Sequence, residues 1–232
     1  MSPFSAFDAV VDVARHVADG LTVLLTPFAG DLAGAVAIVA GTVAVRLLLS
    51  PLSYLQFRAA RRAAALTPRL AELRARYRDD PVRLAAETLA ARRAAGVSAV
   101  PGLLPALLRA PFLMVMYRLV VVPAGGAAPA LLSGTVFGAP MAAHLLSGPA
   151  AVVPVFVVLL VLATVTAWCT SRLLRRLGTA PARLSTLTPY ASVIMVAVLP
   201  LAGALYVVTT TAWSLLEQAL CAKSTRLTDL QT

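Results

Sequence analysis

Long apolar blocks, separated by polar and basic stretches, are the main pattern along the chain. They cover residues 33–55, 102–122, 150–170 and 189–220. A helix needs about 20 apolar residues to cross the hydrocarbon core of a bilayer, and the first three blocks have this length. Surface helices of soluble proteins instead have one apolar face and one polar face, so polar residues recur every few positions. The pattern therefore predicts an all-α polytopic membrane protein.

The fourth block is too short for two ordinary spans and too long for one. It has 32 residues, whereas two full spans need about 40. Pro200 and Gly203 lie in its middle, and proline interrupts the hydrogen bonds of a helix. We predict a turn there between two short spans, 189–200 and 203–220, which gives five transmembrane helices. A single tilted helix is the alternative.

The first segment, 1–30, has a different pattern. Within residues 4–25 the apolar side chains recur at helical spacing, with acidic residues such as Asp8 and Asp12 between them. This amphipathic pattern favours an external helix that lies in the membrane interface. Thr26-Pro27 is expected to break it.

A basic segment from Arg58 to Arg93 follows the first span and holds ten of the 20 basic residues. Its leucines form one helical stripe before Asp79-Asp80-Pro81, where Asp80 is suited to the N-cap of a second helix and Pro81 to its first position. Gly96 is expected to stop that helix. We predict a cytoplasmic helical hairpin over residues 57–95.

Charge predicts the orientation of these elements. The chain has a net charge of +10 but only 13% charged residues, against about 25% in soluble proteins, which favours an anionic bilayer over DNA as the partner. The 171–188 loop has four basic residues and the 123–148 loop has none. The positive-inside rule then places the N-terminus outside and the hairpin and the tail, 223–232, in the cytoplasm. An odd number of spans, within a core of residues 31–222, agrees with this orientation.

Arg46 lies inside the first span. It precedes the basic segment by enough residues to lie ~13–15 Å from the cytoplasmic face, where an arginine costs roughly 2.5–3.5 kcal/mol on insertion scales. Glu217 is near the cytoplasmic end of the last span, so we expect no acidic partner for Arg46 within the spans. A water-filled cavity open to the cytoplasm is the simplest explanation. Snorkelling and pairing with backbone carbonyls are the alternatives.

A cationic cavity would attract an acidic peptide side chain, a lipid phosphate or a small anion. Arg109 in the second span has a similar depth, and hydroxyls of the third and fifth spans could add donors: Thr164, Thr166, Thr209, Thr210, Thr211 and Ser214. Taken singly, such hydroxyls more often bond to a carbonyl of their own helix. The sequence shows no catalytic motif, so we expect no enzyme, no catalytic residue, no cofactor and no metal.

Three segments resemble the YidC family of membrane protein insertases. Residues 46–52 with Gln56 are similar to the family's first span, 96–117 to the start of its second span, and 199–218, with Trp213, to its last span. Together the similarity covers about residues 40–118 and 189–220. The length resembles the short members from Gram-positive bacteria, including actinobacteria, which lack a large external domain.

The resemblance implies an insertase and chaperone in the plasma membrane of a bacterium. Its groove, open to cytoplasm and lipid, would use Arg46 to attract acidic residues in the tail of a client protein briefly. Arg109 stands where many members have glutamine. The implied groove residues are Arg46, Arg109, Gln56, Thr164, Thr209 and Trp213. The implied partners are nascent membrane-protein clients, lipids, the ribosome, the signal recognition particle receptor and the Sec translocon. A small anion or lipid transporter that uses Arg46 and Arg109 is the alternative.

Overall fold

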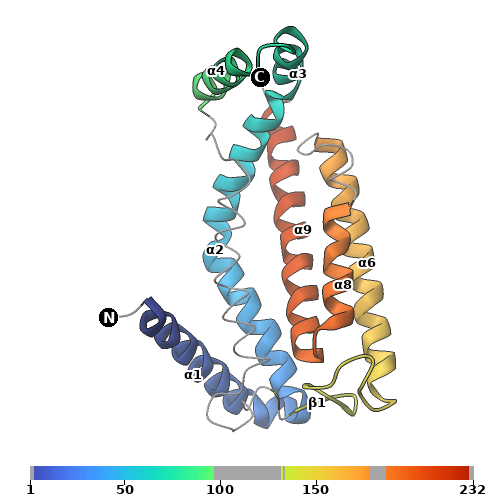
Figure 1. Ribbon diagram of the computed structural model, residues 1–232. Helices are drawn as coiled ribbons and strands as arrows, with labels where there is room; N and C mark the ends of the chain where they lie inside the picture. The colour runs from blue at the N-terminus through green and yellow to red at the C-terminus, as the bar shows by residue number, and fades with distance from the viewer. Residues whose placement is uncertain (1–2, 97–131, 133, 178–186, 230–232) are drawn as a thin grey trace.

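The computed structural model describes residues 3–96, 132, 134–177 and 187–229. Helices account for most of this part of the chain (Figure 1). Two helical stretches in it are long and apolar enough to cross a membrane, Val11–Arg76 and Val152–Arg176. The predicted second span, 102–122, lies outside the described residues. The all-α prediction agrees with this architecture, and the count of five spans stays a prediction.

Helix α1 (Pro3–Ala29) packs against α2 (Ala33–Ala65), with the short 3-10 turn η1 (Gly30–Leu32) between them. The break predicted at Thr26-Pro27 is wrong, because α1 continues through Pro27 to Ala29. Pro27 is in the last turn of the helix, so few residues beyond it depend on the hydrogen bonds that it disturbs. The chain turns instead at Gly30, whose φ of +52° is easily adopted by glycine.

The basic segment forms α3 (Thr67–Arg76) and α4 (Pro81–Ala94), which pack against each other. The carboxylate of Asp80 accepts a hydrogen bond from the backbone N–H of Arg83 at 2.9 Å, which confirms Asp80 as the N-cap. Gly96 follows the end of α4 with a φ of +63°, as predicted for a helix stop. The placement of this pair in the cytoplasm stays a prediction.

The last apolar block is broken at its proline. The 3-10 turn η3 (Thr188–Tyr190) leads into α8 (Ala191–Val198), Leu199 is extended with a ψ of 155°, and α9 (Leu201–Asp229) follows. Helices α8 and α9 pack against each other and against α6 (Val152–Leu177). The predicted turn at Pro200 is therefore confirmed. At about 1.5 Å per residue, α8 is far shorter than a bilayer core, whereas α9 is longer than the 203–220 expected.

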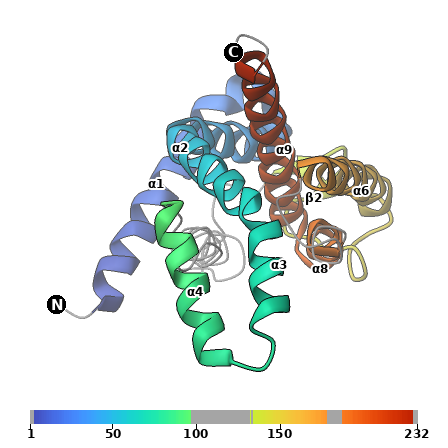
Figure 2. The ribbon, with the colours of Figure 1, turned by 90° about the horizontal axis from the view of Figure 1, so that it is seen from above.

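The two ends of the bundle differ. One end of the bundle holds α3, α4 and the C-terminal ends of α6 and α9, and we call it the basic end (Figure 1). The other end holds the segment 134–151, and we call it the loop end. This separation agrees with the charge asymmetry of the sequence. Seen from above, α2, α6 and α8 all lie next to α9 (Figure 2).

At the loop end, two short strands pair antiparallel: β1 (Thr135–Val136) and β2 (Ala139–Pro140). The following segment covers the start of α9. The backbone N–H groups of Leu201 and Ala202 donate to the carbonyls of Ala143 and Met141, at 2.9 and 3.0 Å. First-turn amides of a helix lack partners within the helix, so these carbonyls satisfy them and hold the α8–α9 turn against the loop.

The apolar core lies mainly toward the loop end. Its largest fully buried side chains are Phe156, Met141, Leu201, Val152 and Val196. The outer side of α6 has the opposite character, since Val157, Val161 and Val165 are about half exposed. Valines with this exposure on a helix as apolar as α6 are typical of a surface that faces lipid.

Candidate functional site

A polar strip runs between α2 and α9, two apolar helices that pack side by side (Figures 1 and 2). Helix α2 contributes Arg46 and Ser50, which are one turn apart. Helix α9 contributes Thr210, Trp213 and Glu217, whose spacing of three and four residues places them on one face. All five are half-buried. We call this set the polar strip.

Arg46 is held by a threonine of α9. Its Nε donates to the Oγ1 of Thr210 at 2.8 Å, and its Nη2 donates to the same oxygen. Arginine presents several donors in a planar fork, so two of them can meet one acceptor and fix the plane of the group. The interaction joins residues 164 positions apart. It orients the guanidinium, and the threonine that does so carries no charge.

The neighbours of Thr210 behave differently. Thr209 donates to the carbonyl of Leu205 at 2.8 Å, and Thr211 donates to that of Val207 at 2.8 Å. Both are bonds within α9, the behaviour that the sequence suggested for isolated hydroxyls. Among the three successive threonines, it is Thr210 that faces Arg46. The sequence named Thr209 for the groove, and the structure places its neighbour against the arginine.

Glu217 of α9 forms a second connection between the two helices, at Ser50, one turn beyond Arg46 on α2. The hydroxyl of Ser50 donates to Glu217 Oε1 at 2.7 Å, and the indole Nε1 of Trp213 donates to the same oxygen at 3.0 Å. Ser50 also lies 3.0 Å from the carbonyl of Arg46. A hydroxyl has one proton, so these two acceptors compete for it. The strip therefore contains a cation and an acidic side chain on neighbouring turns of one helix pair.

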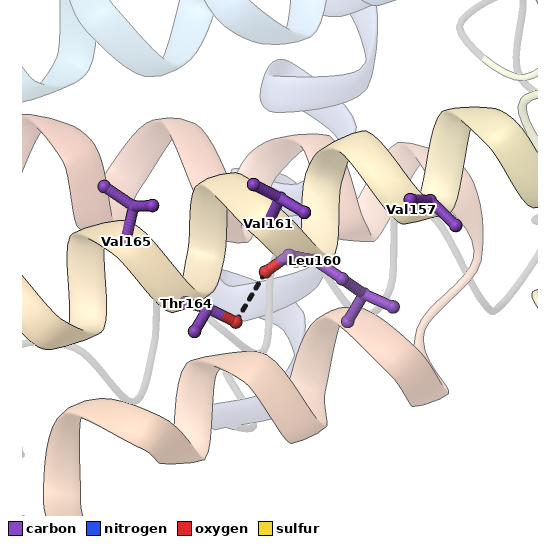
Figure 3. Close-up of a pocket in the computed structure, with 5 residues that line it drawn as sticks. All are labelled: Val157, Leu160, Val161, Thr164 and Val165. Carbon is purple, nitrogen blue, oxygen red and sulfur yellow. Dashed lines mark hydrogen bonds between the residues drawn. The ribbon is translucent and has the colours of Figure 1, made fainter.

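The remaining predicted groove residues lie elsewhere. Gln56 is half-buried on α2, ten positions beyond Arg46. Thr164 is exposed on α6 and donates to the carbonyl of Leu160 at 2.7 Å. With four apolar side chains it lines a shallow hollow on that helix, drawn in Figure 3: Val157, Leu160, Val161 and Val165. Arg109 lies outside the described residues.

Sequence reasoning missed the roles of Ser50 and Glu217 in this strip. Glu217 was expected to lie too near the end of its helix to matter for Arg46. The spacing offered a signal, because Ser50 follows Arg46 by four residues and Glu217 follows Thr210 by seven, which keeps each pair on one helix face. The register of α2 against α9 decides which faces meet, and a sequence does not give that register.

This arrangement supports few kinds of chemistry. Within the part of the chain that the structure describes, no group of three or more histidine, cysteine or acidic side chains could hold a metal ion. A strip with a guanidinium, hydroxyls and one carboxylate can bind charged or hydrogen-bonding groups. Together with the apolar helices, it defines a helical membrane protein with a polar strip between two of its helices.

Comparison with known proteins identifies the family. The sequence model described as "60Kd inner membrane protein" matches residues 25–228, so the chain belongs to this family, that of the YidC, Oxa1 and Alb3 proteins. The chain is 34% identical over 90 residues to the "Membrane protein insertase YidC" of Acidiphilium cryptum, a match that covers 39% of this chain and 15% of the relative.

Two other relatives have a similar identity over a similar length. The "Membrane protein insertase YidC" of Chlamydia caviae is 36% identical over 84 residues, 36% of this chain and 11% of that protein. The "Inner membrane ALBINO3-like protein 2, chloroplastic" of Chlamydomonas reinhardtii is 38% identical over 82 residues, 35% of this chain and 19% of that protein. The chain thus spans less than a fifth of the length of each of these relatives. The predicted resemblance to the YidC family is confirmed.

Proposed function

We propose that this protein is a membrane protein insertase and chaperone of a bacterial plasma membrane. The observation that carries the proposal is the hydrogen-bonded placement of Arg46 against Thr210 between two apolar helices. A cation is expensive in such a place, so an embedded arginine is a functional candidate by default. Family membership and the insertase names of the relatives support the same activity.

In the proposed mechanism, Arg46 attracts an acidic residue in the hydrophilic tail of a client while the tail passes the polar strip. Opposite charges attract more strongly near a low-dielectric bundle than in water. Thr210 keeps the guanidinium oriented, so the client does not have to order it. The contact must be transient, because a tail that stayed bound to Arg46 could not leave the strip.

The apolar segment of the client would move along the exposed valines of α6 and then enter lipid. Burial of apolar surface supplies about 25 cal/mol per Å², which is enough to drive the step without a nucleotide. We place the basic end in the cytoplasm and the N-terminus outside, since basic segments remain on the cytoplasmic side. Clients and lipids are the proposed partners, with the ribosome, the signal recognition particle receptor and the Sec translocon as further ones.

The test uses purified protein in liposomes and single-span clients that differ in one tail residue. Arg46→Ala should slow a client with an acidic tail and spare one with a neutral tail. Arg172→Ala is the matched control, because Arg172 is exposed at the basic end of α6 and remote in sequence from the strip. Equal insertion of both clients by the Arg46 variant would refute the electrostatic role.

A second measurement addresses the activity itself. A photoreactive residue at position 209, beside Thr210, should crosslink to a client during insertion. Absence of any client adduct under active translation would contradict the insertase proposal. Saturable anion flux through liposomes that hold the protein without clients would favour the alternative, a small anion or lipid transporter.

A further inference from the structure

The carboxylate of Glu217 has one occupied and one available oxygen. Oε1 accepts from Ser50 at 2.7 Å and from Trp213 at 3.0 Å. Among the described residues, no hydrogen bond or ion pair reaches Oε2, and the Glu217 side chain is half-buried. The two donors fix the plane of the group, so Oε2 has a defined direction.

The surroundings of Glu217 are basic. Arg58, Arg61 and Arg62 follow on the last turns of α2, the helix that faces it. In the described parts of α2, α6, α8 and α9, the only other acidic residue is Asp229, at the end of α9. A positively charged group that approaches this end of the bundle therefore meets arginines on α2, and Glu217 is the acidic side chain of the polar strip that faces this helix.

Glu217 and Arg46 occupy different depths. The carboxylate of Glu217 contacts Ser50, which follows Arg46 by four residues along α2, a rise of about 6 Å. Helices α2 and α9 both run toward the basic end (Figure 1), so Glu217, at the level of Ser50, is closer to that end than Arg46. The polar strip thus presents a positive group deeper in the bundle and a negative group nearer the basic end.

We propose that Glu217 binds the lysine or arginine that flanks the apolar segment of a client on the side of the basic end. This inference rests on the proposed insertase function and adds a specificity determinant to it. A client with an acidic leading tail and a basic trailing flank would match both charges of the strip in order. The same client in the reverse orientation would place each charge beside its like, which is unfavourable.

The experiment compares Glu217→Gln with the wild type in liposomes that hold no membrane potential, so that the potential does not act on client charges. Glutamine keeps an oxygen that accepts from Ser50 and Trp213, and it removes the charge. Two single-span clients share one neutral tail and differ in their trailing flank, Lys-Lys or Ser-Ser. A thermal unfolding curve of each variant in detergent establishes that it is folded.

Glu217→Gln should slow the Lys-Lys client by about fivefold, the factor that corresponds to about 1 kcal/mol for a partly solvated ion pair, and leave the Ser-Ser client unchanged. Arg46→Gln is the matched control and should not distinguish these two flanks. If Glu217→Gln slowed both clients equally, or slowed neither of them, the proposed role of Glu217 would be overturned. If the wild type inserted neither client, the insertase function itself would be overturned. This result is distinct from the two outcomes that concern Glu217 alone.

Discussion

The guanidinium of Arg46 on α2 donates from two nitrogens to the hydroxyl oxygen of Thr210 on α9. This contact gives an embedded cation a defined position between two helices that are distant in sequence. A guanidinium in a fixed orientation loses less conformational entropy on binding an anion than a mobile one. The contact is therefore relevant both to the stability of the helix pair and to the proposed capture of acidic client residues.

The first prediction concerns the stability of this pair. Thr210→Val keeps the shape of the side chain and removes the acceptor of Arg46, so we expect a loss of about 1–2 kcal/mol in unfolding free energy. Thermal unfolding in detergent measures it. Thr209→Val is the control, since it removes a bond within one helix and should cost below about 0.5 kcal/mol. Equal losses for the two variants would contradict the special role of Thr210.

The second prediction separates charge from geometry at Arg46. Arg46→Lys keeps the positive charge and replaces the planar fork by a single ammonium group, so one oxygen no longer receives two donors. Insertion of a client with an acidic tail should fall between the rates of the wild type and of Arg46→Ala. A neutral-tail client should be inserted equally by all three proteins. A lysine variant as slow as the alanine variant would show that charge without the fork is insufficient.

The third prediction concerns the contact between the loop end and η1. A Cβ on Gly134 would lie 2.6 Å from the carbonyl oxygen of Asp31, so Gly134→Ala should destabilise the protein by about 1–3 kcal/mol. Hydrogen exchange should then become faster at the amides of Leu201 and Ala202, whose acceptors belong to the same loop.

Gly20→Ala is the matched control for this variant. Gly20 is exposed in the middle of α1, and a Cβ there would meet nothing within 4 Å. Alanine should raise stability by about 0.5–1 kcal/mol, because glycine loses more conformational freedom in a helix. If Gly134→Ala were as stable as Gly20→Ala, the close approach to Asp31 would not restrain the loop.

The fourth prediction concerns the turn between β1 and β2. Phe137 has a φ of +51° and is 85% exposed, and Gly138 follows with a φ of +81°. Asparagine adopts this conformation more readily, and Asn-Gly favours such two-residue turns. Phe137→Asn should therefore stabilise the protein by about 1 kcal/mol in detergent. Leu146→Asn, also at an exposed apolar residue of the loop end, should change stability by less than about 0.5 kcal/mol. A similar gain from both would attribute the effect to lost apolar exposure.

The sequence by itself determined the class of protein and much of its local structure. Continuous apolar blocks indicated helices, and residues with strong local preferences marked their ends: Asp80 at the start of α4, Gly96 after it and Pro200 between α8 and α9. Such preferences depend on neighbours in the chain, so they can be read without the fold. Pro27 shows the limit, because one lost hydrogen bond in a last turn did not end α1.

Only the tertiary structure decided which polar residues meet. Arg46 was recognisable from its cost in an apolar block, but its partner could have been any of several hydroxyls. The rotation and register of α9 against α2 bring Thr210 to Arg46 and Glu217 to Ser50, and they leave Thr209 bonded within its own helix. That register follows from packing of many apolar side chains at once, and no short segment of the sequence contains it.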